Sequence, residues 1–187
     1  MKALSAAAAL LLLMLQQLSG PCGAKERGLG ARECLQKHVP RSMLTELFEM
    51  SGRLKSSVPR DEIKHKKLLP KFGKSVKKSK GSSVLKELLD FYIKDVFKKA
   101  QVDIADKNIF NYLTRLKKDF EHCLSLYPST VSSKDRRMIK RMKETFIELD
   151  IQGVYKAIGE LETVVDWVST YMHPEKKKKQ KETVSQK

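Results

Sequence analysis

Lysine is the residue whose pattern in this chain most directly suggests chemistry. Eight lysines fall between positions 64 and 80, and no acidic residue occurs between Ile63 and Lys86. They are Lys64, Lys66, Lys67, Lys71, Lys74, Lys77, Lys78 and Lys80. A run of this kind binds polyanions by releasing their counterions, which predicts salt-sensitive binding without sequence preference. Few aromatic residues interleave the lysines, so base stacking and specific nucleic-acid recognition are not expected.

A second basic group lies further along the chain, in a stretch with helical periodicity. Its members are Arg136, Arg137, Lys140 and Arg141, and they fall opposite Met138 and Met142 on a helical projection. The formal net charge of the chain is +16. Charge runs are usually only solvated, but eight unopposed lysines exceed what solubility requires. The pattern predicts an anionic partner: heparan sulfate or another glycosaminoglycan, an acidic membrane surface, or free nucleic acid.

The sequence contains no recognisable catalytic motif. G-x-S-x-G, G-x-x-x-x-G-K-[ST], H-E-x-x-H and G-x-G-x-x-G are all absent. The histidines, His38, His65, His122 and His173, are scattered, and neither C-x-x-C nor H-x-x-x-H occurs. We therefore expect no enzyme activity, no cofactor and no metal site.

The two ends of the chain have compositions of their own. Ala3–Leu15 is apolar except for Ser5, and small residues precede Lys25, which is typical of a signal peptide cleaved after Ala24. The apolar run is too short to span a membrane. We expect a secreted, extracellular protein with a signal peptide at 1–24, a helical domain at 25–173 and a Lys-rich, disordered tail at 174–187.

Cysteine usage agrees with secretion. Cleavage after Ala24 would remove Cys22 and leave Cys34 and Cys123. Two cysteines in an oxidising compartment most simply form one disulfide. A bridge closing so long a loop is worth roughly 4 kcal/mol on the chain-entropy model.

The apolar spacing is helical throughout and predicts an all-α fold. Six segments carry it: Met43–Leu54, the short Asp61–Leu69, Leu85–Phe97, Phe110–Cys123, Met138–Leu149 and Val154–Met172. Gly153 should separate the last two helices, Ser132 or Ser133 should cap the fifth, and Lys71–Ser83 should be a loop. Four long helices can form a bundle, and the long connection from Leu54 to Leu85 favours a crossover topology.

Trp167 has two interpretations. On a helical projection it lies opposite the apolar positions Ile158 and Val165. An exposed tryptophan is unusual and is enriched in binding hot spots, which would make Trp167 a receptor contact. Alternatively, Trp167 lies beneath the Lys-rich loop or the tail of a partner.

Three strings resemble the interleukin-10 family of class II cytokines. They are GVYKAIGELE at Gly153–Glu162, LKSSVPRDEIK at Leu54–Lys64 and FYIKDV at Phe91–Val96. The resemblance implies a six-helix cytokine that joins two different receptor chains, of the interleukin-20 receptor alpha and interleukin-10 receptor beta type, and triggers JAK/STAT-type signalling. It also implies that the first and last helices and the loop after the first helix meet one receptor chain, with Lys55, Lys156 and Glu162 as contacts.

The resemblance also identifies a departure from the family pattern. Family members commonly have two disulfides, and the second pair corresponds here to Ser82 and Ser129. Its loss would leave the linker from Leu124 to Ser133 less constrained. The last two helices could then be exchanged between subunits, which would give a homodimer.

Two functions outside receptor binding remain open. The same lysines would suit a direct-acting, cationic host-defence protein that binds bacterial membranes or extracellular DNA. Membrane disruption normally requires an exposed apolar helix face, whereas here the apolar faces are needed for the core, which favours the cytokine. A helical carrier protein would instead require a roomy apolar cavity.

Overall fold

The computed structural model describes residues 30–63, 65–69, 72–78, 80–100 and 107–174. These ranges contain helices and no strand, which confirms the predicted all-α fold class. The elements are α2 Ala31–His38, α3 Arg41–Ser57, α4 Gly73–Val76, α5 Gly81–Phe91, the π-helix η1 Tyr92–Val96, α6 Phe97–Lys99, α7 Lys107–Leu126, α8 Ser133–Glu148 and α9 Asp150–Met172. No helix among the described residues is both long and apolar enough to cross a membrane.

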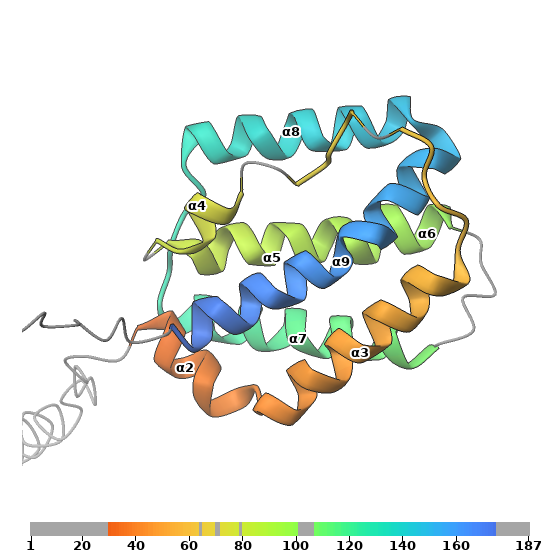
Figure 1. Ribbon diagram of the computed structural model, residues 1–187. Coiled ribbons are helices and arrows are strands. Elements are labelled where there is room, and N and C mark those ends of the chain that lie inside the picture. Colours follow the sequence, from red (N-terminus) through yellow and green to blue (C-terminus); the bar gives the residue numbers. More distant parts are fainter. Residues whose placement is uncertain (1–29, 64, 70–71, 79, 101–106, 175–187) are drawn as a thin grey trace, which may run out of the picture.

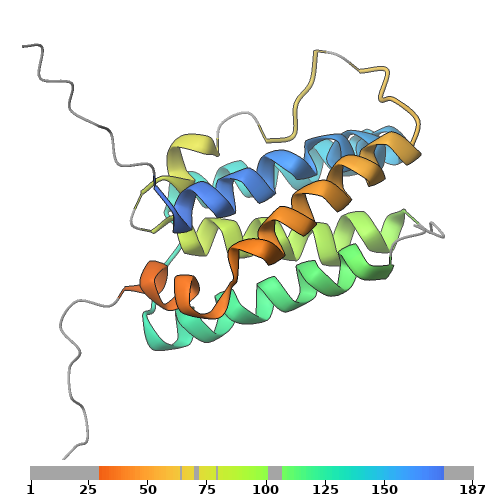
Figure 2. The ribbon, with the colours of Figure 1, turned by 60° about the horizontal axis from the view of Figure 1, so that its bottom comes forward.

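The long helices form a bundle with the predicted crossover (Figure 1). Helices α3, α5 and α8 run in one direction, and α7 and α9 return in the other. The chain leaves α3, passes along α8 and enters α5 parallel to α3, which a short hairpin could not achieve. Figure 2 shows α3 lying across α9, with α5 and α7 on the opposite side of the bundle.

The core follows the predicted apolar stripes. On α9, every position of the predicted stripe from Val154 to Met172 is at most 2% exposed. Tyr92 is fully buried, and its hydroxyl donates a hydrogen bond to the Ala157 carbonyl oxygen at 2.7 Å. Burial of this kind is the main favourable term in folding. It also means that the amphipathic helices use their apolar faces against one another.

The prediction of a short helix at Asp61–Leu69 was wrong. The described residues of this segment are non-helical, and the short helix α4 lies instead within the predicted loop. Three backbone N–H groups of the segment donate to carboxylates: Ile63 to Asp61, and Leu68 and Leu69 to Glu160. Because buried backbone donors need partners, these carboxylates replace the bonds that a helix would have supplied.

The role predicted for Gly153 was also wrong. Helix α9 begins at Asp150, where φ is +48°, and Gly153 lies inside the helix. A Cβ atom at Gly153 would stand 2.5 Å from the Phe146 carbonyl oxygen. Glycine is therefore required for the close approach of α8 and α9, not for breaking the helix.

A helix that the sequence did not predict, α2, precedes α3. Pro40 separates the two at the start of α3. The Cys34–Cys123 disulfide is confirmed and joins α2 to α7, with the two Cα atoms 5.7 Å apart. The predicted signal peptide and nearly all of the predicted tail lie outside the described residues.

Candidate receptor face and basic surface

Two of the predicted receptor contacts meet in the structure. Lys55 on α3 and Glu162 on α9 form an ion pair with 2.8 Å between Nζ and Oε2. The lysine side chain is 51% exposed and the glutamate side chain 26%. An ion pair this exposed contributes little to stability. It does place two matched positions, far apart in sequence, on one accessible face formed by α3 and α9.

Lys156, the third predicted receptor contact, lies apart from this ion pair and has a different role. It is 4% exposed, and its ammonium group lies 2.6 Å from Asp61 Oδ1 and donates to the Ile63 carbonyl oxygen at 2.8 Å. A side chain so enclosed does not offer its charge to a receptor directly. The expectation of a direct contact does not fit this burial; instead, Lys156 positions the loop that follows α3.

Glu160, one turn along α9, secures the same loop at a second point. Its two carboxylate oxygens accept hydrogen bonds from the backbone N–H groups of Leu68 and Leu69, at 3.1 and 2.8 Å. Burial raises the pKa of Glu160, although these hydrogen bonds oppose the shift. Sequence reasoning missed Glu160 and Asp61 as positioning residues, because helical spacing carries no information about a non-helical partner.

The packing of Trp167 fits the interpretation that places it beneath the Lys-rich loop. It is partly buried and packs against the core. A Cβ atom at Gly73 of α4 would lie 3.6 to 3.7 Å from the indole ring, so the ring supports α4 directly. Trp167 therefore lies beneath the Lys-rich segment.

A groove between α3 and α9 completes this face. It is lined by Arg41, Leu44, Thr45, Phe48, Glu49, Val165, Asp166, Ser169 and His173. Phe48 is 46% exposed in this groove, and Phe110 on α7 is the other exposed phenylalanine among the described residues, at 40%. Phe48 belongs to the predicted stripe of the first helix, so the sequence indicated a core residue and missed its exposure.

The Lys-rich segment runs along α8, which brings the two predicted basic groups together (Figure 1). At one end, the Glu62 backbone N–H donates to the Gln152 side chain, and Lys66 pairs with Glu148. These contacts join the segment to the junction of α8 and α9. Lys67 and Arg141 line one shallow pocket. At the far end, the Ser75 hydroxyl donates to Asp135 at 2.5 Å, beside the α8 N-cap at Ser132.

We call the described basic residues of these two segments the basic surface. They are Lys66, Lys67, Lys74, Lys77, Lys78, Lys80, Arg136, Arg137, Lys140 and Arg141, and all are exposed. Within the described residues, Lys66 and Lys140 alone among them lie within 4.0 Å of an acidic oxygen, at 3.9 and 3.7 Å. The predicted positions Lys64 and Lys71 lie outside the described residues.

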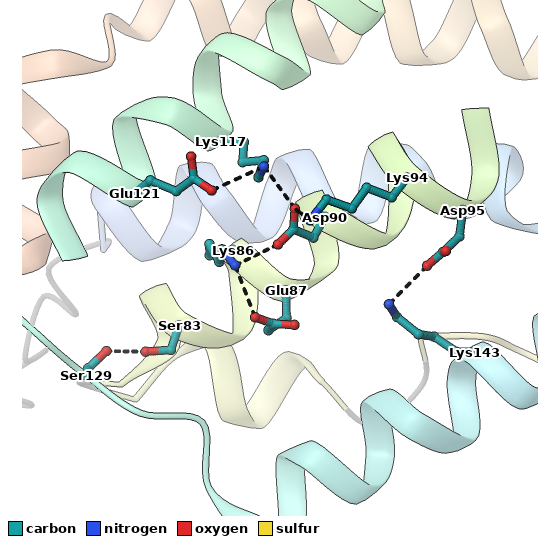
Figure 3. A network of polar contacts seen from close by, with 10 residues as sticks. All are labelled: Ser83, Lys86, Glu87, Asp90, Lys94, Asp95, Lys117, Glu121, Ser129 and Lys143. Atoms are coloured by element: carbon teal, nitrogen blue, oxygen red, sulfur yellow. Dashed lines mark hydrogen bonds and ion pairs between the residues drawn. The ribbon is translucent and has the colours of Figure 1, made fainter. Parts of the chain in front are cut away.

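Other lysines neutralise an acid within the bundle instead (Figure 3). The Asp90 carboxylate lies 2.6 Å from Lys86 Nζ and 3.1 Å from each of Lys94 and Lys117. Burial opposes ionisation of Asp90, but the three hydrogen bonds from lysine outweigh it and lower the pKa to about 2. This network joins α5 and η1 to α7 and serves the fold.

Of the two serines predicted at the positions of the family's second disulfide, Ser129 contacts a neighbour of the other. Ser129 is hydrogen-bonded to Ser83 rather than to Ser82 (Figure 3). Ser82 is fully buried, and its hydroxyl has no hydrogen-bond partner among the described residues. A side chain–side chain hydrogen bond thus joins the start of α5 to the linker before α8.

Comparison with known proteins places this helical architecture. A model of the Interleukin 10 family matches residues 10–174, most of the chain. The chain belongs to the interleukin 10 family. Interleukin-26 of Homo sapiens is 28% identical over 157 residues, covering 83% of this chain and 90% of that protein. Interleukin-10 of Canis lupus familiaris is 30% identical over 146 residues, covering 72% and 79%.

Membership of the interleukin 10 family indicates the general function of this chain. The family consists of secreted cytokines that bind class II cytokine receptors and are not enzymes. Interleukin-10 of Sus scrofa is a further relative, 29% identical over 144 residues, with 72% of this chain and 81% of that protein covered.

Proposed function

We propose that this protein is secreted and bridges two different class II receptor chains, of the interleukin-20 receptor alpha and interleukin-10 receptor beta type, to trigger JAK/STAT-type signalling. The observation that carries the proposal is the α3–α9 face. On this face, Lys55 of α3 and Glu162 of α9 form an ion pair. The groove between the same two helices exposes the aromatic ring of Phe48. Aromatic residues, phenylalanine included, are enriched at the cores of protein–protein interfaces.

The loop after α3 adds a preorganised edge to this face. Lys156 and Glu160 fix it at Asp61, Ile63, Leu68 and Leu69. A surface that is already ordered loses less conformational entropy when it binds. Lys156 therefore supports receptor binding through the loop, and Trp167 does so through α4.

The test is affinity for purified receptor ectodomains, measured by surface plasmon resonance. Phe48→Ala and Glu162→Lys should each weaken binding to one receptor chain by about tenfold or more, as expected for hot-spot residues. The matched control is Ile147→Ala, since Ile147 is 69% exposed on α8, away from the groove. Equal affinity for all variants, with folding intact by circular dichroism, would reject the α3–α9 face.

We also propose that the basic surface holds the cytokine on heparan sulfate or other polyanions. The support is the convergence of two basic segments along α8, where only Lys66 and Lys140 of the basic surface lie within 4.0 Å of an acidic oxygen among the described residues. Lys67→Gln/Lys78→Gln/Arg141→Gln should elute from heparin at lower salt than the parent protein. The control changes the same residue types elsewhere, as Lys37→Gln/Lys118→Gln/Arg53→Gln; an equal shift would mean that only net charge matters.

The host-defence alternative is less well supported by the packing of α8. Its apolar residues Ile139, Met142 and Phe146 are buried, so the basic helix has no free apolar face with which to enter a bilayer. Leakage from vesicles rich in anionic lipid is the direct test. Leakage by the parent protein that the triple substitution abolishes would establish this second activity.

A further inference from the structure

Two histidines face each other beside the disulfide. His38 is the last residue of α2, and His122 precedes Cys123 on α7. Their ring centroids are 4.9 Å apart at an interplanar angle of 69°, and both side chains are exposed. One ligand atom from each histidine and the Cys34 sulfur all lie within 4.8 Å of one another. Because that sulfur is in the disulfide, it is not a thiolate ligand.

The disulfide holds the two imidazoles in place. Cys34 and His38 are four residues apart, so they lie on the same face of α2. His122 is adjacent to the other half of the bridge. The covalent bond therefore sets the distance between the two helices at the point where the rings meet. Metal sites gain affinity when their ligands are already positioned by the fold.

A carboxylate lies next to the pair. Asp119 is one turn before His122 on α7, on the same face. Its Oδ2 atom is buried and has no hydrogen-bond partner among the described residues. Arg115, His38 and His122 are close enough to act on this carboxylate electrostatically. A buried carboxylate oxygen without a partner is unfavourable unless a proton or a cation satisfies it.

We propose that His38 and His122 form a binding site for a divalent transition metal such as Zn²⁺, with Asp119 as a nearby anionic group outside the set of ligand atoms that lie within 4.8 Å of one another. Imidazole nitrogen and carboxylate oxygen are preferred zinc ligands, at about 2.0 to 2.2 Å from the metal. Two such ligands on one ion lie at most about 4.2 Å apart, so a small rotation of the exposed rings brings them into range. Water or a group from a binding partner completes the coordination shell.

Isothermal titration of the purified protein, with its disulfide intact, tests the site using Zn²⁺ alone. His38→Ala and His122→Ala should each weaken Zn²⁺ binding by about tenfold or more, and Asp119→Asn by a smaller factor. The matched control is His65→Ala, since His65 is exposed and outside the cluster. Absence of binding at millimolar Zn²⁺, or equal loss in the His65 variant, would overturn the proposal.

Histidine resonances provide a readout that a change in stability would not produce. Zn²⁺ should shift the ring proton signals of His38 and His122 and leave those of His65 and His173 in place. Zn²⁺-dependent shifts at His65 or His173 in place of the pair would place the ion elsewhere and refute the assignment.

Discussion

The charged residues differ between two surfaces of the molecule. Several of those on the face formed by α3 and α9 are paired, whereas most of those on the basic surface along α8 are unpaired among the described residues. On α9, Lys156, Glu160 and Glu162 each meet a partner from α3 or the loop after it. Along α8, most of the cations meet no acid within the described residues. Paired charges fix a surface in one shape, whereas unpaired charges leave a long-range field. The molecule thus separates a shaped recognition face from an electrostatic one.

The largest expected effect comes from adding a disulfide between the start of α5 and the linker before α8. Ser83→Cys/Ser129→Cys should form a disulfide, because these two hydroxyls are already in contact. Closing this loop should stabilise the protein by up to about 4 kcal/mol on the chain-entropy model. Urea unfolding measures the gain, and a thiol count verifies the bond. If helix exchange produces a homodimer, the double variant should stay monomeric in light scattering.

The second-largest expected effect comes from removing one member of an ion pair on α9. Lys156→Ala would leave the partly exposed Asp61 carboxylate and the Ile63 carbonyl oxygen without their buried partner, which should cost about 2 kcal/mol in the free energy of unfolding. Lys67→Ala on the basic surface is the matched control, with an expected change within about 0.5 kcal/mol. Similar losses for the two lysines would erase the contrast between the surfaces.

The Asp90 network provides a third, pH-dependent test. Asp90→Asn should cost about 2 kcal/mol, because it removes hydrogen bonds between charged groups. The pKa of Asp90 is lowered to about 2, so its stabilisation is complete above the ordinary aspartate pKa near 4 and is lost as the pH falls towards 2.

The variant should therefore lose less stability than the parent between pH 4 and pH 2. Chemical unfolding at a series of pH values measures this difference. Parallel curves for the two proteins across that range would mean that Asp90 is not the group responsible.

The smallest expected effect on stability is on the basic surface itself. The triple substitution Lys67→Gln/Lys78→Gln/Arg141→Gln should change the free energy of unfolding by less than about 0.5 kcal/mol per position. Receptor affinity should also be unchanged, while elution from heparin shifts to lower salt. A loss of receptor affinity in this variant would show that the two surfaces are not separate.

The sequence predicted those parts of the fold that depend on periodic burial. The stripes on α3, α5, α7, α8 and α9 are mostly buried as predicted, with Phe48 and Phe110 as exposed exceptions; the disulfide is confirmed, and Ser132 is the cap of the two serines proposed. The errors fell where side chains replace regular backbone bonding or where backbones meet. Asp61–Leu69 is held by carboxylates, and Gly153 serves a close contact between helices. Neither effect leaves a periodic trace in the sequence.

The candidate sites divide in the same way. Lys55 and Glu162 were predicted from matched strings and meet in space, but the burial of Lys156 could not be read from its charge. Phe48 and Asp119 were missed, because the exposure of an aromatic ring and an unpartnered oxygen are properties of packing. The convergence of two basic segments required the path of the loop along α8.

The position of the Cys34–Cys123 disulfide also determines what a protease can release. The Lys-rich segment lies inside the ring that Cys34 and Cys123 close, so a trypsin-like cut there yields two pieces that stay tied until the cystine is reduced. The linker near Ser129 lies outside that ring, and a cut there frees α8 and α9 as a separate fragment. Nicked cytokine would thus run intact on a non-reducing gel in the first case and split in the second.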